Sequence, residues 1–134
     1  MTRRFSLGLL AAICVGMMSV AALPVAAQQF LGQYTAYIGQ QDLYNSNGQR
    51  LTEHWQILRQ DRANLHRFGI SQPGDEWDPW FGNYNARGAM EQMIMQGAAD
   101  PVARQNIIAG GATVVVQVYG WNGQPSRIDV QVWR

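Results

Sequence analysis

The sequence predicts an α+β domain in which three helices pack on a small antiparallel sheet. Three observations support this fold class. Apolar residues recur at helical spacing in the middle of the chain, valines alternate with other residues near its end, and an Asn-Gly turn signal separates two alternating segments. A sheet with one aliphatic face needs a cover, and helices grouped on that face would provide it.

The N-terminal segment has the layout of a cleavable signal peptide. Two arginines near the start precede an uncharged, mostly apolar stretch over 5–23, and Pro24 and the small residues Val25-Ala26-Ala27 follow. We expect cleavage after Ala27, so that 1–27 is removed and 28–134 remains as a single domain of 107 residues, periplasmic or secreted. An uncleaved anchor is the alternative, because 19 apolar residues can just span a bilayer.

Two details of the segment concern its export route and lipidation. The pair Arg3-Arg4 matches the twin-arginine export pattern in part, and ordinary secretion is the alternative route. Cys14 is the only cysteine, and it follows Ile13 rather than a small residue, so we do not expect it to be lipidated. The predicted mature domain therefore has no disulfide, thiol nucleophile or cysteine-based metal site.

Charge and motif content narrow the function classes further. All basic residues are arginines, and the mature part holds eight of them against nine acidic residues, a formal charge of −1. Such a domain lacks the basic field of a nucleic-acid-binding protein. Because no phosphate loop or dinucleotide motif occurs, we expect no cofactor. Once the signal is removed, we also expect no attachment to a membrane.

The first elements follow from local composition. Residues 34–38 are rich in β-formers and predict a short strand, whereas 28–33 is polar and is expected to be frayed. Residues 45–48 (Asn-Ser-Asn-Gly) predict a turn. A helix is predicted over 52–67 because Leu51, Trp55, Leu58, Arg62 and Leu65 fall on one stripe, with Thr52 as the N-cap and Gly69 as the stop.

The second half completes the fold. Residues 70–82 contain two prolines and two glycines, and they predict a loop. Helices are predicted over 84–96 and 101–108, the latter opened by Asp100 as N-cap and Pro101. Residues 112–119 and 126–133 predict a C-terminal hairpin, to which 34–38 would add a third strand.

The candidate catalytic residues are His54, Asp61 and His66, all on the first predicted helix. A histidine with a carboxylate can act as a general base. However, His54 and Asp61 are separated by about 10 Å along a helix, so they would need a third group to converge. The structural alternative makes Asp61 a semi-buried hydrogen-bond acceptor and His54 a residue at the surface or at the boundary of the core.

Arg62 is a candidate binding residue that falls inside the apolar stripe of the same helix. A buried arginine needs a partner, and Asp61, Asp42 or an acid of the 75–78 segment would provide one. The functional alternative is an anion-binding arginine, because the guanidinium fork fits carboxylate and phosphate groups.

The loop over 70–82 holds the remaining candidates. Trp77, Trp80 and Phe81 would form an exposed platform for a glycan or a protein, or would fold back over the core. Asp75, Glu76 and Asp78 suggest a cation site, but their spacing does not match a calcium-binding EF-hand loop. We therefore expect no metal.

Taken together, these observations favour an exported, non-enzymatic domain that binds an envelope protein or a glycan. Its surface would combine the 70–82 loop with the hairpin aromatics Tyr119, Trp121 and Trp133. The alternative function is a small hydrolase or ligand-binding protein that uses His54, Asp61 and His66.

Overall fold

The computed structural model describes residues 26–134. The predicted signal peptide lies outside the described residues except for Ala26 and Ala27. Export and cleavage therefore stay predictions. Within the described part of the chain, no helix is long and apolar enough to cross a membrane.

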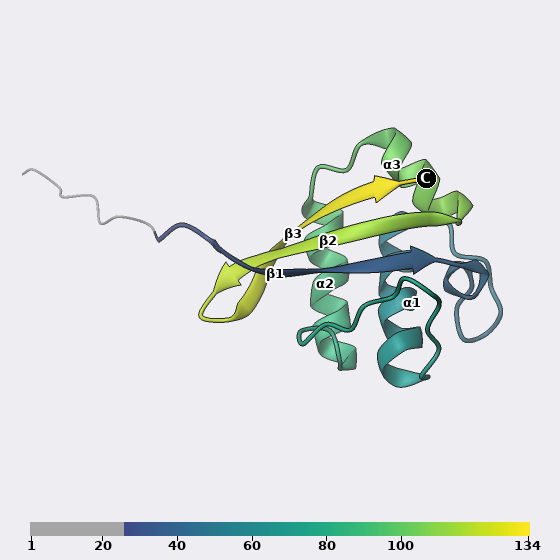
Figure 1. Cartoon of the computed structure of the whole chain (residues 1–134), viewed down its shortest axis with the longest axis horizontal. Coiled ribbons are helices and arrows are strands. Elements are labelled where there is room, and N and C mark those ends of the chain that lie inside the picture. Colours follow the sequence, from purple (N-terminus) through teal and green to yellow (C-terminus); the bar gives the residue numbers. More distant parts are fainter. Residues whose placement is uncertain (1–25) are drawn as a thin grey trace, which may run out of the picture.

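The fold is α+β, as predicted, with a three-stranded antiparallel sheet of order β1-β2-β3 (Figure 1). The strands are β1 (Gln29–Ile38), β2 (Ala112–Trp121) and β3 (Gln124–Trp133). The hairpin of β2 and β3 is confirmed, and each strand extends two residues further toward the turn than predicted.

Strand β1 begins at Gln29, and the expectation of a frayed 28–33 segment is therefore wrong. Its first residues pair with the end of β2, so that Gln29 lies opposite Gly120 and Gln33 opposite Gln117. The register shifts between Phe30 and Gly32, which marks a bulge. The segment forms a strand because it hydrogen-bonds to β2. The polar composition of residues 28–33 does not reveal such a partner.

The helices are α1 (His54–Arg67), α2 (Tyr84–Gln96) and α3 (Pro101–Ala109). Helix α1 begins two residues later than predicted, because Glu53 rather than Thr52 is its N-cap. The side chain of Gln56 accepts a hydrogen bond from the Glu53 amide and so closes the first turn. Helix α2 has the predicted bounds, and α3 ends one residue beyond them.

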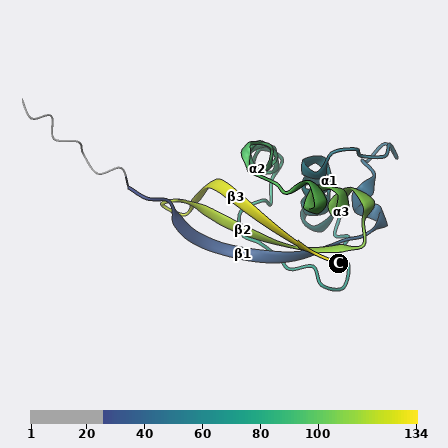
Figure 2. The ribbon, with the colours of Figure 1, turned by 90° about the horizontal axis from the view of Figure 1, so that it is seen from above.

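All three helices cover one face of the sheet (Figure 2). Strand residues alternate in direction, so every second side chain faces the helices, and these side chains are aliphatic apart from Tyr34. They pack with apolar residues of the helices into one core, whose fully buried members include Ile38, Ile57, Met90, Ile107, Val114, Val116 and Val118. The opposite face carries polar residues such as Gln117, Asp129 and Gln131. In the sheet, Gln117 lies opposite Asp129, and Gln131 lies opposite Val115.

Between β1 and α1 lies a short 3₁₀ helix, η1 (Gln40–Leu43). The Asp42 carboxylate accepts hydrogen bonds from the Gly39 amide at 2.9 Å and from the Asn64 side chain at 2.8 Å. The second bond fixes η1 against α1. The predicted turn at 45–48 follows, closed by a bond from the Gly48 amide to the Asn45 carbonyl.

Two glycine substitutions test this packing. At Gly120, a Cβ atom would lie 1.8 Å from the backbone oxygen of Gln124, whereas at Gly88, in α2, no heavy atom lies within 4 Å. We expect Gly120→Ala to lower the free energy of unfolding by about 1–3 kcal/mol through overpacking. Gly88→Ala should raise it by about 0.5–1 kcal/mol, since alanine is the better helix former. Urea denaturation measures both, and equal effects of the two variants would contradict the fold described here.

Candidate functional site

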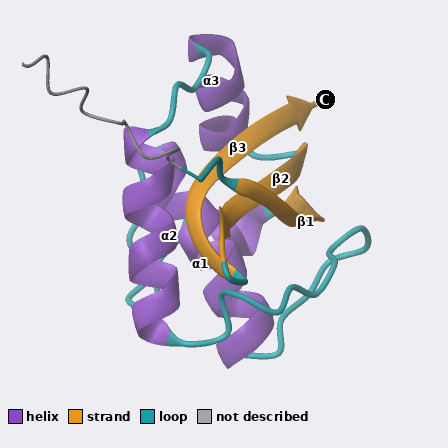
Figure 3. Ribbon diagram, turned by 90° about the vertical axis from the view of Figure 1, so that its left-hand side faces the viewer, coloured by secondary structure: helices purple, strands orange, loops and turns teal. Residues whose placement is uncertain are grey.

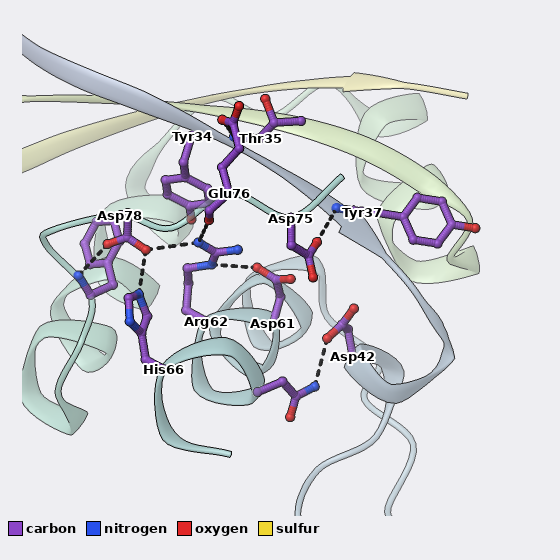
Figure 4. A network of polar contacts seen from close by, with 12 residues as sticks. Tyr34, Thr35, Tyr37, Asp42, Asp61, Arg62, His66, Asp75, Glu76 and Asp78 are labelled. Carbon is purple, nitrogen blue, oxygen red and sulfur yellow. Dashed lines mark hydrogen bonds and ion pairs between the residues drawn. The ribbon is translucent and has the colours of Figure 1, made fainter. Parts of the chain in front are cut away.

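Arg62 of α1 lies at the centre of a buried polar network (Figure 4). Its side chain is completely buried. Nε donates to Asp61 at 2.7 Å, and Nη1 donates to Asp78 at 3.0 Å and to the Glu76 carbonyl at 2.8 Å. The guanidinium carbon lies 4.1 Å from the centre of the Tyr34 ring, a cation–π contact. The prediction that this arginine needs a buried partner is confirmed, with Asp61 and Asp78 in that role.

Asp78 is the second centre of the network. Besides Arg62, it accepts hydrogen bonds from the amides of Trp80 and Phe81 at 2.9 and 2.7 Å. His66 Nε2 lies 2.8 Å from its carboxylate, so this nitrogen carries the proton when Asp78 is ionised. Burial favours a higher pKa of Asp78, but the hydrogen bonds from His66, Phe81 and Arg62 outweigh burial and lower its pKa.

The carboxyl group of Asp61 has the opposite shift. Burial raises the pKa of Asp61 to about 7, although the charge of Arg62 acts in the opposite direction. Burial also raises the pKa of Asp42, against the hydrogen bonds from Asn64 and Gly39. These buried carboxyl groups belong to the contacts that fasten η1 and the 70–82 loop to α1.

The structure does not bring the three candidate catalytic residues together. His66 is bound to Asp78 and Asp61 to Arg62, whereas His54 lies at the other end of α1. The twelve residues between the two histidines correspond to about 18 Å along the helix axis. His54 is 7% exposed and lines a small cavity of about 110 Å³ between α3 and β3. Burial and the nearby charge of Arg104 lower the pKa of His54.

The other two acids of the 70–82 loop, Asp75 and Glu76, bind backbone groups of β1. Glu76 accepts from the Thr35 amide at 2.7 Å, and Asp75 accepts from the Tyr37 amide at 2.8 Å. The Glu76 amide donates in turn to the Thr35 carbonyl. In Figure 3 the loop runs from the end of α1 to the edge of the sheet and back to α2. No group of three metal-ligating side chains occurs among residues 26–134.

The aromatic residues of this loop have different environments. Trp77 is 69% exposed and contacts the His66 ring edge-on, Trp80 is half-buried, and Phe81 is buried in the core. Arg62 and Phe81 are thus inaccessible to a ligand, and of the four predicted binding residues Trp77 is the one most open to solvent. On the hairpin, Trp121 and Trp133 are exposed, whereas Tyr119 is covered by Arg127 and Phe30.

A groove that the sequence did not reveal lies beside α1, and we call it the amide groove. It has a volume of about 540 Å³ and is lined by η1, the turn that follows it and the last turns of α1. Among its lining residues are the amides Gln40, Gln41, Gln60 and Asn64 and the exposed aromatics Tyr44 and Phe68. None of the lining residues is charged. The one signal in the sequence is the amide-rich segment 40–49.

Comparisons with protein-family models, with curated proteins and with solved structures found no match to this chain. The function must therefore be argued from the geometry of the sites alone.

Replacement of Arg62 tests the buried network. Arg62→Met replaces the arginine with a long apolar side chain, which can fill much of the same space. It leaves Asp61 and Asp78 without their buried counter-charge. We expect the free energy of unfolding to fall by about 3–5 kcal/mol in urea denaturation. The control Arg127→Met breaks an exposed ion pair with Asp129 and should cost about 1 kcal/mol or less. Equal losses would contradict the central role of Arg62.

The raised pKa of Asp61 predicts a pH dependence of stability. Between pH 3.8 and about 7 the folded state keeps a proton that the unfolded state releases, so this group makes the fold less stable as the pH rises through that interval. Asp61→Asn cannot ionise. Its free energy of unfolding, taken relative to the wild type, should therefore increase over this interval and level off above it. A difference that is constant with pH in denaturation series would refute the assignment.

Proposed function

We propose that this chain is an exported, non-enzymatic binding protein that takes a glycan in the amide groove. The observation that carries the proposal is the chemistry of the groove lining: amides and aromatic rings with no charge. Amide groups donate and accept hydrogen bonds, as sugar hydroxyls require, and aromatic rings pack against the apolar faces of sugar rings. The groove also has a volume in the range of ligand sites.

The groove is supported by fixed elements on both sides. Asn64 donates to Asp42 at 2.8 Å and accepts from Gln60 at 2.9 Å, which connects η1 to two turns of α1. The turn at 45–49 is held by the Asn45 side chain, which accepts from the amides of Asn47 and Gln49. A site built in advance loses less entropy when a ligand binds, and this favours affinity.

The hydrolase alternative has weaker support. Two of its three residues are engaged in the buried network, and His54 lies in a separate cavity. A general base has to reach the proton that it removes, but Asp61 is buried and His66 is largely buried with its Nε2 atom against Asp78. Action outside the cytoplasm, in the periplasm or as a secreted protein, is proposed from the signal-like segment at 1–27.

Calorimetric titration of residues 28–134 with neutral tetrasaccharides tests the proposal. Suitable probes are the tetrasaccharides of galactose, of N-acetylglucosamine and of methyl-esterified galacturonic acid. We expect at least one to bind, and Tyr44→Ala or Phe68→Ala to weaken that binding about tenfold through loss of ring contact.

Trp121→Ala is the matched control, because Trp121 is a similarly exposed aromatic on the hairpin, outside the groove. It should leave the affinity unchanged. Absence of binding to all three neutral probes and to the charged tetragalacturonate would overturn the proposal. A loss of affinity in Trp77→Ala, with Tyr44→Ala and Phe68→Ala unaffected, would overturn the choice of the amide groove and favour the 70–82 loop.

A further inference from the structure

A second groove adjoins the amide groove, and we call it the arginine groove. It has a volume of about 310 Å³, and Arg59, Arg67 and Arg87 line it together with residues of α1 and α2. These two helices lie side by side in Figure 3. Ser46, Gln60 and Phe68 line both grooves, so the two grooves lie next to each other on α1.

The arginine groove carries an excess of positive charge. Glu91 is its one acidic lining residue and pairs with Arg59 at 2.6 Å. The ion pairs found within residues 26–134 involve neither Arg67 nor Arg87. The groove therefore holds three guanidinium groups and one carboxylate, although the predicted mature part of the chain is close to neutral.

Arg87 is the unusual member of this group. It is only 4% exposed, and Nη1 donates to the Phe81 carbonyl at 3.2 Å, which is a neutral partner. Burial, followed by the charges of Arg59 and Arg67, lowers the pKa of Arg87, although the charge of Asp78 acts in the opposite direction. A buried charge surrounded by like charges is unfavourable unless an opposite charge approaches it. The groove is thus complementary to an anion.

Phe68 lies at the boundary of the two grooves and lines both of them. The guanidinium carbon of Arg67 lies 5.0 Å from the centre of the Phe68 ring, and the same ring lines the amide groove. A sugar ring packed on Phe68 would therefore hold its substituents within reach of Arg67. Guanidinium forks bind carboxylate and phosphate oxygens through paired, charge-assisted hydrogen bonds.

We propose that the ligand is an acidic saccharide, whose sugar ring occupies the amide groove and whose carboxylate or phosphate group lies beside Arg67 and Arg87. This inference rests on the proposed glycan-binding function and specifies the ligand class for the same site.

The test compares matched saccharides. Tetragalacturonate and its methyl ester have the same backbone, but the ester lacks the negative charges. We expect tetragalacturonate, or a phosphorylated galactose tetrasaccharide in the second arm, to bind about tenfold more tightly than its neutral counterpart. Added salt should reduce this difference, since it screens charges. If the carboxylate gives the larger gain in affinity, the groove prefers a carboxylate, and if the phosphate does, the groove prefers a phosphate.

Three variants assign the effect to the groove. Arg67→Gln removes an exposed charge and should abolish the preference for the acidic saccharide while the ester still binds. Glu91→Gln frees Arg59 from its partner and should strengthen the preference. Arg127→Gln removes a charge that is also exposed, but on the hairpin and outside both grooves, and should change nothing.

The outcomes separate the two proposals. Equal affinity for the acidic and neutral saccharides, or an unchanged preference in Arg67→Gln, overturns this inference but leaves the glycan proposal standing. If neither acidic nor neutral saccharides bind, both the glycan proposal and this inference are overturned. Because Arg67 is exposed and has no ion pair within residues 26–134, its replacement should not unfold the domain, which circular dichroism of the variant checks.

Discussion

The guanidinium of Arg62 is the point at which α1, the 70–82 loop and β1 meet. It bonds Asp61 on its own helix, Asp78 and the Glu76 carbonyl on the loop, and it stacks on Tyr34 of the strand. A buried charge of this kind is tolerated only when its partners are in place. The position of a long loop without regular structure therefore depends on one side chain of a helix.

Helix α1 has different roles on its different faces. Ile57 and Leu58 belong to the core, Asp61 and Arg62 hold the loop, and the remaining polar positions line the two grooves. Because a helix advances 100° per residue, a fourteen-residue helix can present several chemically distinct faces. Arg59 and Arg62 lie only about 60° apart around this helix, yet Arg59 stands at the wall of a groove and Arg62 is sealed in the interior.

The parts of the fold that depend on local pattern were predictable from the sequence, and those that depend on partners were not. The predicted helix over 84–96 agrees with the bounds that Asn83 and Gly97 give to α2, and the alternating valines predicted the hairpin. The first half of β1 and the 3₁₀ turn at Asp42 form through contacts with β2 and Asn64. The position of Arg62 within an apolar stripe indicated that it is buried. Both grooves, however, are lined by residues that are far apart in the sequence, and no residue spacing predicts that these residues come together.

The attachment of the 70–82 loop to β1 also affects how copies of the domain can meet. The outward amides of Thr35 and Tyr37 are groups that another strand could pair with at the sheet edge. Here the carboxylates of Glu76 and Asp75 occupy them, and the Glu76 amide occupies the Thr35 carbonyl. The loop thus acts as a negatively charged substitute for a fourth strand, closing this stretch of β1 to sheet extension and aggregation between molecules.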